Sequence, residues 1–226
     1  MTNAPLCLIV GVGPGLSAAL ARRYAAAGFH IAGLARSPGK SDDLAAGLRA
    51  DGAEVDLRAA DAADLPGLRS AIAGIEDAHG SVDTLIYNAY RSTFAPPSQV
   101  APEEMIGDFT VNVAAALAAT QAVLPGMLAA GRGTVLLTGG SLAIDPTGWL
   151  AAASLAATKA GLRNLAFSLN KEMADKGIRV GTVTIAGLIK PGGPFSPDAI
   201  ADATWNFARD PSNPPELLFK GAAPAA

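Results

Sequence analysis

The chain has a single cysteine, which excludes an internal disulfide. Cys7 lies within the apolar segment Leu6–Val10, where we expect it to pack as a small hydrophobic side chain. Histidine is almost as scarce. His30 and His79 are the only two and lie far apart in the sequence, so a metal-dependent hydrolase lacks support. The position of His79 beside Gly80 is explained by the capping of a helix end.

Charge and long apolar segments are also scarce. Charged residues make up 16% of the chain and the net charge is −3, with no basic stripe, so we expect no nucleic-acid partner. No basic segment precedes Leu6, unlike the start of a secretory signal peptide. No apolar run reaches the roughly 18 residues of a membrane span without Gly, Pro or a charge. These features predict a soluble, cytoplasmic protein that does not bind membranes.

What the chain does have is a regular alternation of short apolar runs with longer helical patterns. Its 226 residues are half hydrophobic, enough for one domain with a full core. Strands are predicted at Leu6–Val10, Phe29–Leu34, Glu54–Arg58, Val82–Tyr87, Gly133–Thr138, Ile178–Ile185 and Glu216–Phe219. Helices are predicted at Ser17–Gly28, Asp42–Asp51, Asp64–His79, Pro102–Ala130, Trp149–Lys176 and Pro197–Arg209.

This alternation predicts an α/β fold with a doubly wound parallel sheet of about seven strands and helices on both faces. We expect one domain over residues 1–226, with a frayed tail at residues 220–226. The long helix Pro102–Ala130 is expected to kink near Pro125, because proline removes a helical hydrogen bond.

The first predicted strand is followed by VGVGPGLS, residues Val10–Ser17. Ligands of a doubly wound sheet bind at the carboxyl ends of its strands, where this turn lies. Glycine allows the backbone to approach a phosphate closely, and the N–H groups of the next helix attract the anion. We therefore assign cofactor binding to Gly11, Gly13, Gly15 and Leu16. Because Leu16 interrupts the G-x-G-x-x-G spacing, a plain tight turn is the alternative.

The second predicted strand ends with Arg36-Ser37. Dehydrogenases that use NAD place an acidic residue at this point for the ribose hydroxyl, whereas a cation and a hydroxyl suit a 2′-phosphate. Arg36 and Ser37 therefore favour NADP, with NAD as the alternative, although Arg36 would also fit as a solvated loop charge. Asp61 and Asn88-Ala89 follow the third and fourth strands and are predicted to line the adenosine pocket. Turn chemistry also favours Asp and Asn at these points.

Gly11-x-x-x-Gly15, Asp61, Asn88-Ala89, Asn112 and Lys159, in this order, resemble the short-chain dehydrogenase/reductase family. The resemblance extends from Leu6 to about Phe219. It implies a Rossmann-type domain, NAD(P) as cofactor, and hydride transfer between a carbonyl and an alcohol. It also implies that Lys159 hydrogen-bonds the nicotinamide ribose, that Asn112 organises a water relay, and that Ala186-Gly187 replaces the family's Pro-Gly, with Gly187 at the cofactor. The alternatives are a surface lysine and a helix-bending asparagine.

The active-site motif departs from the family pattern. The family's Tyr-x-x-x-Lys reads Leu155-Ala-Ala-Thr-Lys159 here, and leucine cannot transfer a proton. No tyrosine follows Tyr90 in the sequence. Gly140 stands at the position of the family's serine, so the adjacent Ser141 is the candidate to polarise the carbonyl. The proton would then come from Ser141, Ser154, Tyr90, or a water held by Asn112 and Lys159.

Two functions are compatible with this sequence. One is an NADP-dependent oxidoreductase for a small carbonyl or alcohol, with Lys159, Asn112 and Ser141 as its catalytic residues. The other is an NADP(H)-binding protein without catalysis, such as a sensor or a regulatory subunit. The segment Leu188–Ala203 is short and rich in Pro and Gly, so we expect an open substrate pocket. Its expected apolar lining is Trp149, Leu150, Leu188 and Phe195.

Apolar helix faces predict assembly into a homodimer or homotetramer. Such faces are too hydrophobic to remain in water, and in the resembled family they form a two-fold interface. The expected interface residues are Ala114, Leu117, Ala118 and Gln121 on one helix and Leu162, Leu165, Ala166 and Leu169 on the next.

Overall fold

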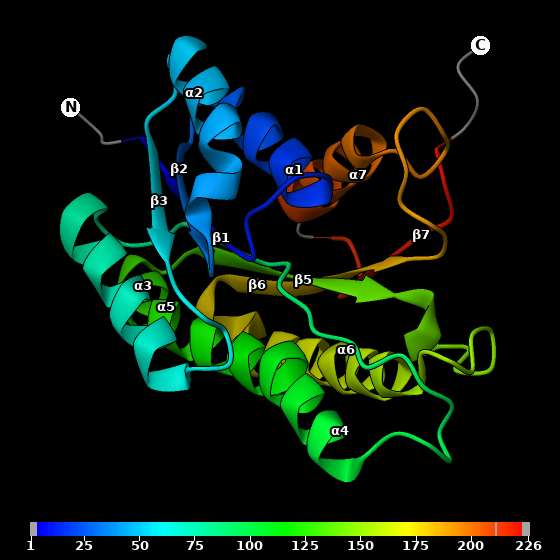
Figure 1. Cartoon of the computed structure of the whole chain (residues 1–226). Coiled ribbons are helices and arrows are strands. Elements are labelled where there is room, and N and C mark those ends of the chain that lie inside the picture. Colours follow the sequence, from blue (N-terminus) through cyan, green and yellow to red (C-terminus); the bar gives the residue numbers. More distant parts are fainter. Residues whose placement is uncertain (1–3, 211, 223–226) are drawn as a thin grey trace.

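The computed structural model describes residues 4–210 and 212–222. Seven strands form one sheet in the order β3-β2-β1-β4-β5-β6-β7, and all pairings are parallel (Figure 1). The strands are β1 (Leu6–Val10), β2 (His30–Ala35), β3 (Val55–Ala59), β4 (Thr84–Tyr87), β5 (Gly133–Gly140), β6 (Ile178–Ile185) and β7 (Glu216–Phe219). The chain runs outward from β1 to β3 and returns to β4, so the strand order reverses between β1 and β4. Ligands bind at such a reversal point in doubly wound sheets.

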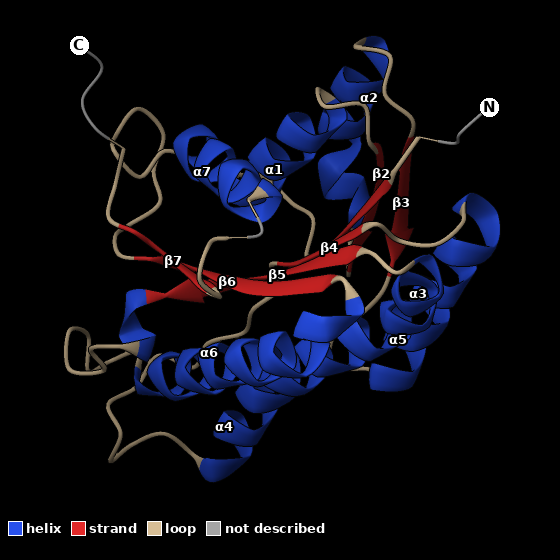
Figure 2. Cartoon of the chain, turned by 180° about the vertical axis from the view of Figure 1, so that it is seen from behind, coloured by secondary structure: helices blue, strands red, loops and turns tan. Residues whose placement is uncertain are grey.

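Helices cover both faces of the sheet (Figure 2). One face carries α1 (Leu16–Ala25), α2 (Asp42–Ala50) and α7 (Pro197–Arg209). The other face carries α3 (Leu65–His79), α4 (Pro102–Phe109), α5 (Ala115–Ala130) and α6 (Ala153–Met173). This arrangement confirms the predicted doubly wound α/β fold and its seven parallel strands.

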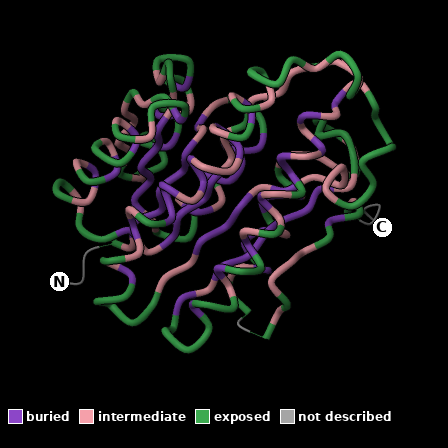
Figure 3. Tube along the Cα trace, turned by 90° about the horizontal axis from the view of Figure 1, so that it is seen from below, coloured by how far each residue is buried: buried purple, intermediate pink, exposed green. Residues whose placement is uncertain are grey.

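The sheet is buried on both sides, and burial is concentrated along its strands (Figure 3). Alternate residues of β1 enter different core clusters: Leu8 and Val10 pack under one face, and Cys7 and Ile9 under the other. This two-sided burial is the reason that the strands are continuous apolar runs. Burial also raises the pKa of the Cys7 thiol, in agreement with its prediction as a core hydrophobe.

The predicted long helix Pro102–Ala130 is not one continuous α-helix, because a π-helical turn at Thr110–Ala114 interrupts it. Pro125 lies inside α5, whereas the π turn brings Asn112 inward to bond the backbone of Arg91. By length and mean hydropathy, 1.7, the same stretch resembles a membrane span. However, Ala115, Ala119 and Val123 pack in the core of the sheet, as in a soluble protein.

The start of α6 also differs from the prediction, because the helix begins at Ala153 and not at Trp149. Ala152 forms an isolated parallel bridge with Ala95, which holds the preceding residues in a non-helical conformation. The predicted interface face of α6 is largely used inside the protomer, since Leu162, Ala166 and Leu169 are buried in its own core. Those three residues therefore cannot form an intersubunit surface in this conformation. On the preceding helix, Ala118 is likewise buried.

The two histidines, which are far apart in the sequence, are in contact in the structure. Their ring centroids are 4.2 Å apart, because β2 begins with His30 and α3 ends with His79 at the same edge of the sheet. His79 bonds Asp56 at 2.7 Å, and burial is the main cause that lowers the pKa of His30. No metal-binding group is found among the described residues.

At the end of the chain, residues 223–226 of the predicted frayed tail lie outside the described residues. The start of that tail is held, because the N–H of Ala222 donates to the Pro194 carbonyl at 2.7 Å.

Candidate functional site

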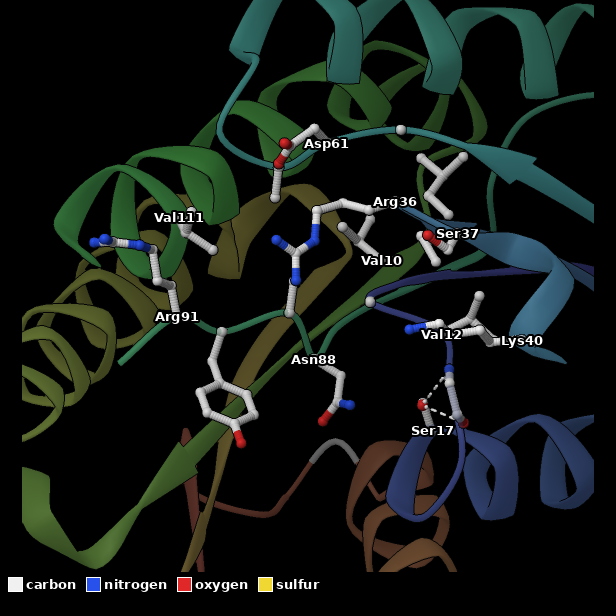
Figure 4. Close-up of a pocket in the computed structure, with 18 of the residues that line it drawn as sticks. Val10, Val12, Ser17, Arg36, Ser37, Lys40, Asp61, Asn88, Arg91 and Val111 are labelled. Atoms are coloured by element: carbon white, nitrogen blue, oxygen red, sulfur yellow. Dashed lines mark hydrogen bonds between the residues drawn. The ribbon is translucent and has the colours of Figure 1, made fainter. Parts of the chain in front are cut away.

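A cavity of about 660 Å³ lies at the carboxyl ends of β1, β2, β3 and β4, beside the reversal of strand order (Figure 4). It brings together seven residues that the sequence assigned to a cofactor: Gly11, Gly13, Arg36, Ser37, Asp61, Asn88 and Ala89. Lining residues that the sequence did not predict include Lys40, Arg91 and Val111. The cavity therefore extends across four adjacent strand ends, which suits an elongated ligand.

The glycine turn passes very close to the loop that follows β4. Gly11 has φ +89°, and a Cβ atom there would lie 2.5 Å from the Ala89 nitrogen. Its N–H donates to the Leu34 carbonyl at 2.8 Å, which keeps the turn against β2. Only glycine combines this dihedral angle with this approach. The turn is thus packed between the ends of β2 and β4, at the floor of the cavity.

Ser17 closes the same turn. Its hydroxyl accepts from the Gly13 N–H at 2.9 Å and donates to the Gly13 carbonyl at 3.0 Å (Figure 4). The N–H of Gly13 is therefore already bonded within the turn. Helix α1 starts at Leu16, and its first intrahelical hydrogen bond runs from the Ala19 N–H to the Gly15 carbonyl. The N–H groups before Ala19 therefore have no acceptor within the helix. Such groups at a helix N-terminus attract anions.

The end of β2 supplies the cations of the cavity. Arg36, Ser37 and Lys40 are all exposed and line it, and Arg36 extends into the cavity on the same side as Asp61 (Figure 4). Lys40 lies in the short helix Pro38–Ser41, which follows β2 directly. Among the described residues that line the cavity, Asp61 is the one acid, and it accepts the Ala63 N–H at 2.9 Å. The expected turn chemistry of Asp61 is therefore present together with its place in the cavity wall.

Lys159 lies beside the carboxyl end of β5, the strand next to β4. Its Nζ donates to the Thr138 carbonyl at 2.6 Å, and the residue is only 9% exposed. Leu137 pairs with Tyr87, so Thr138 is level with Asn88, which lines the cavity. Burial lowers the pKa of the amine from 10.5 to about 8. Lys159 is thus a buried amine at the sheet edge that holds the cavity, although it does not line the cavity itself.

Asn112 binds the loop that follows β4. Its Oδ1 accepts from the Arg91 N–H at 2.7 Å, and its Nδ2 donates to the Arg91 carbonyl and to Thr158 Oγ1, both at 2.8 Å. Thr158 directly precedes Lys159 on α6. Asn112 therefore connects the cavity wall at Arg91 with the helix turn that carries Lys159.

A second polar cluster, which the sequence did not predict, supports this loop from behind. Asp108 is fully buried and accepts from Arg91 Nη1 at 2.6 Å, the Thr93 N–H at 2.8 Å and Ser154 Oγ at 2.5 Å. Arg91 also bonds Glu104. Because Ser154 donates its proton to a buried carboxylate, this hydroxyl does not face the cavity.

Two of the three tyrosines are buried and one is exposed at the cavity. Tyr24 and Tyr87 are buried, and desolvation raises the pKa of both phenols. The Tyr87 hydroxyl donates to the Val111 carbonyl in the π turn. Tyr90 is exposed and lines the cavity. Leu155, one helical turn before Lys159, is half-buried.

Comparisons with known proteins agree with this geometry. The short chain dehydrogenase family matches residues 5–191. This chain belongs to the short-chain dehydrogenase family. It is 33% identical over 184 residues to granaticin polyketide synthase putative ketoacyl reductase 1 of Streptomyces violaceoruber, covering 79% of this chain and 66% of that protein. It is also 33% identical over 181 residues to a very-long-chain 3-oxoacyl-CoA reductase of Aspergillus clavatus, covering 76% and 50% of the two chains.

A solved structure resembles this short-chain dehydrogenase over nearly its whole length. It is a metagenomic short-chain oxidoreductase in complex with NADP, with a TM-score of 0.86 and 26% identity, covering 96% of each chain. The two curated relatives above are longer, and the matched region spans two thirds of one and half of the other.

The remaining predicted residues of this short-chain dehydrogenase lie around the cavity and not in its lining. Gly15 lines a neighbouring groove, and Leu16, the first residue of α1, is buried. Gly187 packs against the Phe195 ring, where a Cβ atom would lie 2.5 Å away. Phe195 in turn packs against Phe219 at 5.8 Å between ring centroids, so it belongs to the side of the core and not to an open pocket.

Ser141 begins the short helix Ser141–Ala143 at the end of β5. Its carbonyl accepts from the N–H groups of Ile144 and Asp145 at 2.8 and 2.9 Å, which fixes the loop at this strand end. Lys40 and Arg91 could have been suspected from the sequence as cations next to predicted strand ends. Nothing in the sequence indicated that Asp108 and Ser154 meet in the interior.

Proposed function

We propose that this short-chain dehydrogenase is an NADP-dependent oxidoreductase that acts on a carbonyl or alcohol substrate. The observation that carries the proposal is the cavity itself, which combines a glycine turn at a helix N-terminus with exposed Arg36, Ser37 and Lys40 at the end of β2. Anions bind at helix N-termini, and cations with hydroxyls at this strand end suit a 2′-phosphate. The NADP bound to the metagenomic relative supports the same assignment.

The residues present fit this cofactor. Gly11 allows the close backbone approach that a pyrophosphate needs, and Asp61 and Asn88 line the end where an adenosine would lie. Lys159 would hydrogen-bond the nicotinamide ribose, since its amine reaches the next strand end along the sheet. Bound NADPH supplies the hydride. The protein binds and orients the cofactor and provides a proton for the substrate oxygen.

The proton donor is the part of this proposal that departs from the family pattern. Leu155 stands where the resemblance places tyrosine, and Ser154 is bonded to Asp108. Tyr90, Ser141 and a water beside Lys159 stay as candidates. A buried amine with a pKa of about 8 is well placed to pass a proton near neutral pH. We infer that the proton comes from a group other than residue 155.

The alternative function is NADP binding without catalysis. Leu155 favours it, because the usual acid is absent while the binding cavity is intact. Calorimetric titration with NADPH and NADH, together with NADPH oxidation over a panel of aldehydes, ketones and enones, distinguishes the two. Binding of NADPH with turnover supports the oxidoreductase. Binding of NADPH without turnover supports the alternative, and equal binding of NADPH and NADH contradicts the assignment of NADP.

We further propose that the protein is one domain, is cytoplasmic and forms a homodimer or homotetramer. Exposed apolar side chains on α4 and α6, Ile106, Phe109 and Phe167, support assembly, because such residues favour burial in an interface. They differ from the residues expected from the sequence. Light scattering at micromolar concentration tests the assembly, and a monomer would contradict it.

A further inference from the structure

Large apolar side chains are exposed on the loops that follow β4 and β5. Tyr90 and Phe94 lie on the first loop, and Trp149 and Leu150 on the second, and each is between 53% and 63% exposed. We call these four residues the apolar rim. Both loops begin at carboxyl ends of central strands and lie on the same side of the molecule (Figure 1). Tyr90 also lines the cavity, so the rim begins where the cavity ends.

The apolar rim is held in a fixed arrangement. The rings of Phe94 and Trp149 have centroids 5.3 Å apart and planes tilted by 36°. Ala95 and the fully buried Ala152 form a parallel bridge directly beside this pair. Two loops that are distant in the sequence are thus joined by both backbone and side chains. The two rings are therefore exposed while the loops that carry them are held in place by the bridge between Ala95 and Ala152.

The loops that follow β4, β5 and β6 carry little charge. Residues 88–101, 141–152 and 186–196 include three charged side chains, Arg91, Asp145 and Lys190. Arg91 is paired with Glu104 and Asp108, and Asp145 accepts from the Thr147 hydroxyl. Asp145 thus keeps its negative charge, and among the described residues of these loops Lys190, after β6, is the one cation for which no ion pair is found. A charged substrate would thus find one cation at most, whereas an apolar substrate would find four exposed hydrophobic side chains.

We propose that the substrate is a neutral carbonyl compound, or the corresponding alcohol, whose flat apolar part lies against Phe94 and Trp149. This inference rests on the proposed function, because it takes the reacting carbon to be next to the cavity. Aromatic faces stabilise flat apolar ligands, and an uncharged ligand has no unpaired charge to desolvate there. A carboxylate or phosphate on the same body lowers affinity, since the apolar rim offers it no partner.

A matched pair of ketones tests the inference: butyrophenone and its para-carboxylate. Binding is measured by calorimetry in the presence of saturating NADP⁺, which cannot reduce the ketone. We expect butyrophenone to bind at least about tenfold more tightly than the carboxylate. Phe94→Ala and Trp149→Ala should each weaken butyrophenone roughly tenfold, as expected for aromatic anchors. Leu128→Ala is the control, because Leu128 is an exposed apolar residue at the opposite edge of the sheet.

Several outcomes would overturn the inference. One is that the carboxylate binds more tightly than butyrophenone and that Lys190→Met weakens its binding. A second is that the Phe94→Ala and Trp149→Ala variants bind butyrophenone like the wild type. A third is that neither ketone binds. Burial of Trp149 by a second copy, detected as a blue shift of its fluorescence with protein concentration in the absence of ligand, would also overturn it. In every variant, unchanged NADP⁺ affinity shows that the fold is intact.

The test separates this inference from the proposed function. If butyrophenone binds in the presence of NADP⁺ but is not reduced by NADPH, the result supports ligand binding at the apolar rim and contradicts the proposed catalysis. Turnover of charged ketones alone supports catalysis and contradicts the apolar rim.

Discussion

Replacing Lys159 with methionine should stabilise the protein at neutral pH while it weakens NADPH binding. The side chain is buried, and burial lowers the pKa of its amine from 10.5 to about 8. At pH 7 the folded protein must therefore hold a protonated amine that its surroundings disfavour. Methionine has a similar length and no charge, so Lys159→Met removes this penalty without leaving a large cavity.

The size of the effect follows from the two pKa values. Their difference is equivalent to about 3 kcal/mol against the folded state at pH 7. The lost hydrogen bond to the Thr138 carbonyl offsets part of this, at about 1–2 kcal/mol. The variant should therefore be more stable than the wild type by about 1–2 kcal/mol at pH 7. NADPH affinity should fall roughly tenfold or more, because a charge-assisted bond to the cofactor is lost.

The pH dependence identifies Lys159 as the cause. As the pH rises through 8, the folded protein releases the proton that the unfolded chain keeps up to 10.5, so the wild type gains stability. Between pH 7 and 9 this gain amounts to about 1.3 kcal/mol, and Lys159→Met should lack it. Other groups titrate alike in both proteins, so urea unfolding of each at several pH values isolates the difference.

Lys171→Met is the matched control, because Lys171 is an exposed lysine on the same helix. It should change neither the stability profile nor NADPH binding. A stability difference between wild type and Lys159→Met that does not vary from pH 7 to 9 would refute the reasoning. Unchanged NADPH affinity in Lys159→Met would refute the cofactor role of this residue.

Four further predictions concern the same site. Arg36→Ala should weaken NADPH about tenfold or more and leave NADH nearly unchanged by calorimetry, since one phosphate contact is lost; equal losses would argue against a 2′-phosphate site. Gly11→Ala should destabilise by about 2 kcal/mol or more in urea unfolding, owing to its positive φ and the contact with Ala89, whereas Gly13→Ala, with open space around it, should not. Asp108→Asn should lower stability by about 2 kcal/mol, because it disturbs three buried or half-buried hydrogen bonds, while Glu104→Gln on the exposed side should have a smaller effect on the melting temperature. Leu155→Tyr should create or raise ketone reduction in a steady-state assay by placing a phenol one turn from the Lys159 amine, and Leu155→Phe, which lacks the hydroxyl, should not.

The sequence predicted the strands well, and it named residues that the structure brings together in one cavity, because both depend on local patterns. Three predicted strands, Leu6–Val10, Ile178–Ile185 and Glu216–Phe219, have the observed bounds, and the first is a continuous apolar run that is buried throughout. Gly11, Arg36 and Asn88 each follow a strand, and parallel topology alone brings such positions to one edge. Their proximity therefore needed no knowledge of packing.

Features that depend on contacts between distant elements were not predictable in this way. An apolar face on α6 fits an interface or a core equally well by periodicity, and Leu162 and Ala166 proved to be core residues. The contact of His30 with His79 depends on where β2 begins and α3 ends. The buried Asp108 looked like any polar residue of a helix, because the donors that satisfy it come from elements remote in the sequence.

The bonds of Asn112 extend the sheet by side-chain chemistry. An amide group that both accepts from the Arg91 N–H and donates to the Arg91 carbonyl has the donor and acceptor pattern of a peptide unit on a neighbouring strand. The Asn112 side chain thus pairs with the backbone of Arg91, beyond the end of β4, as a residue of an adjacent strand would. The pairing group is mounted on a π turn, so its position depends on the one extra residue in that helical turn. Deleting Val113, which does not line the cavity, would turn the Asn112 amide away from Arg91 and release the loop after β4 that forms one cavity wall.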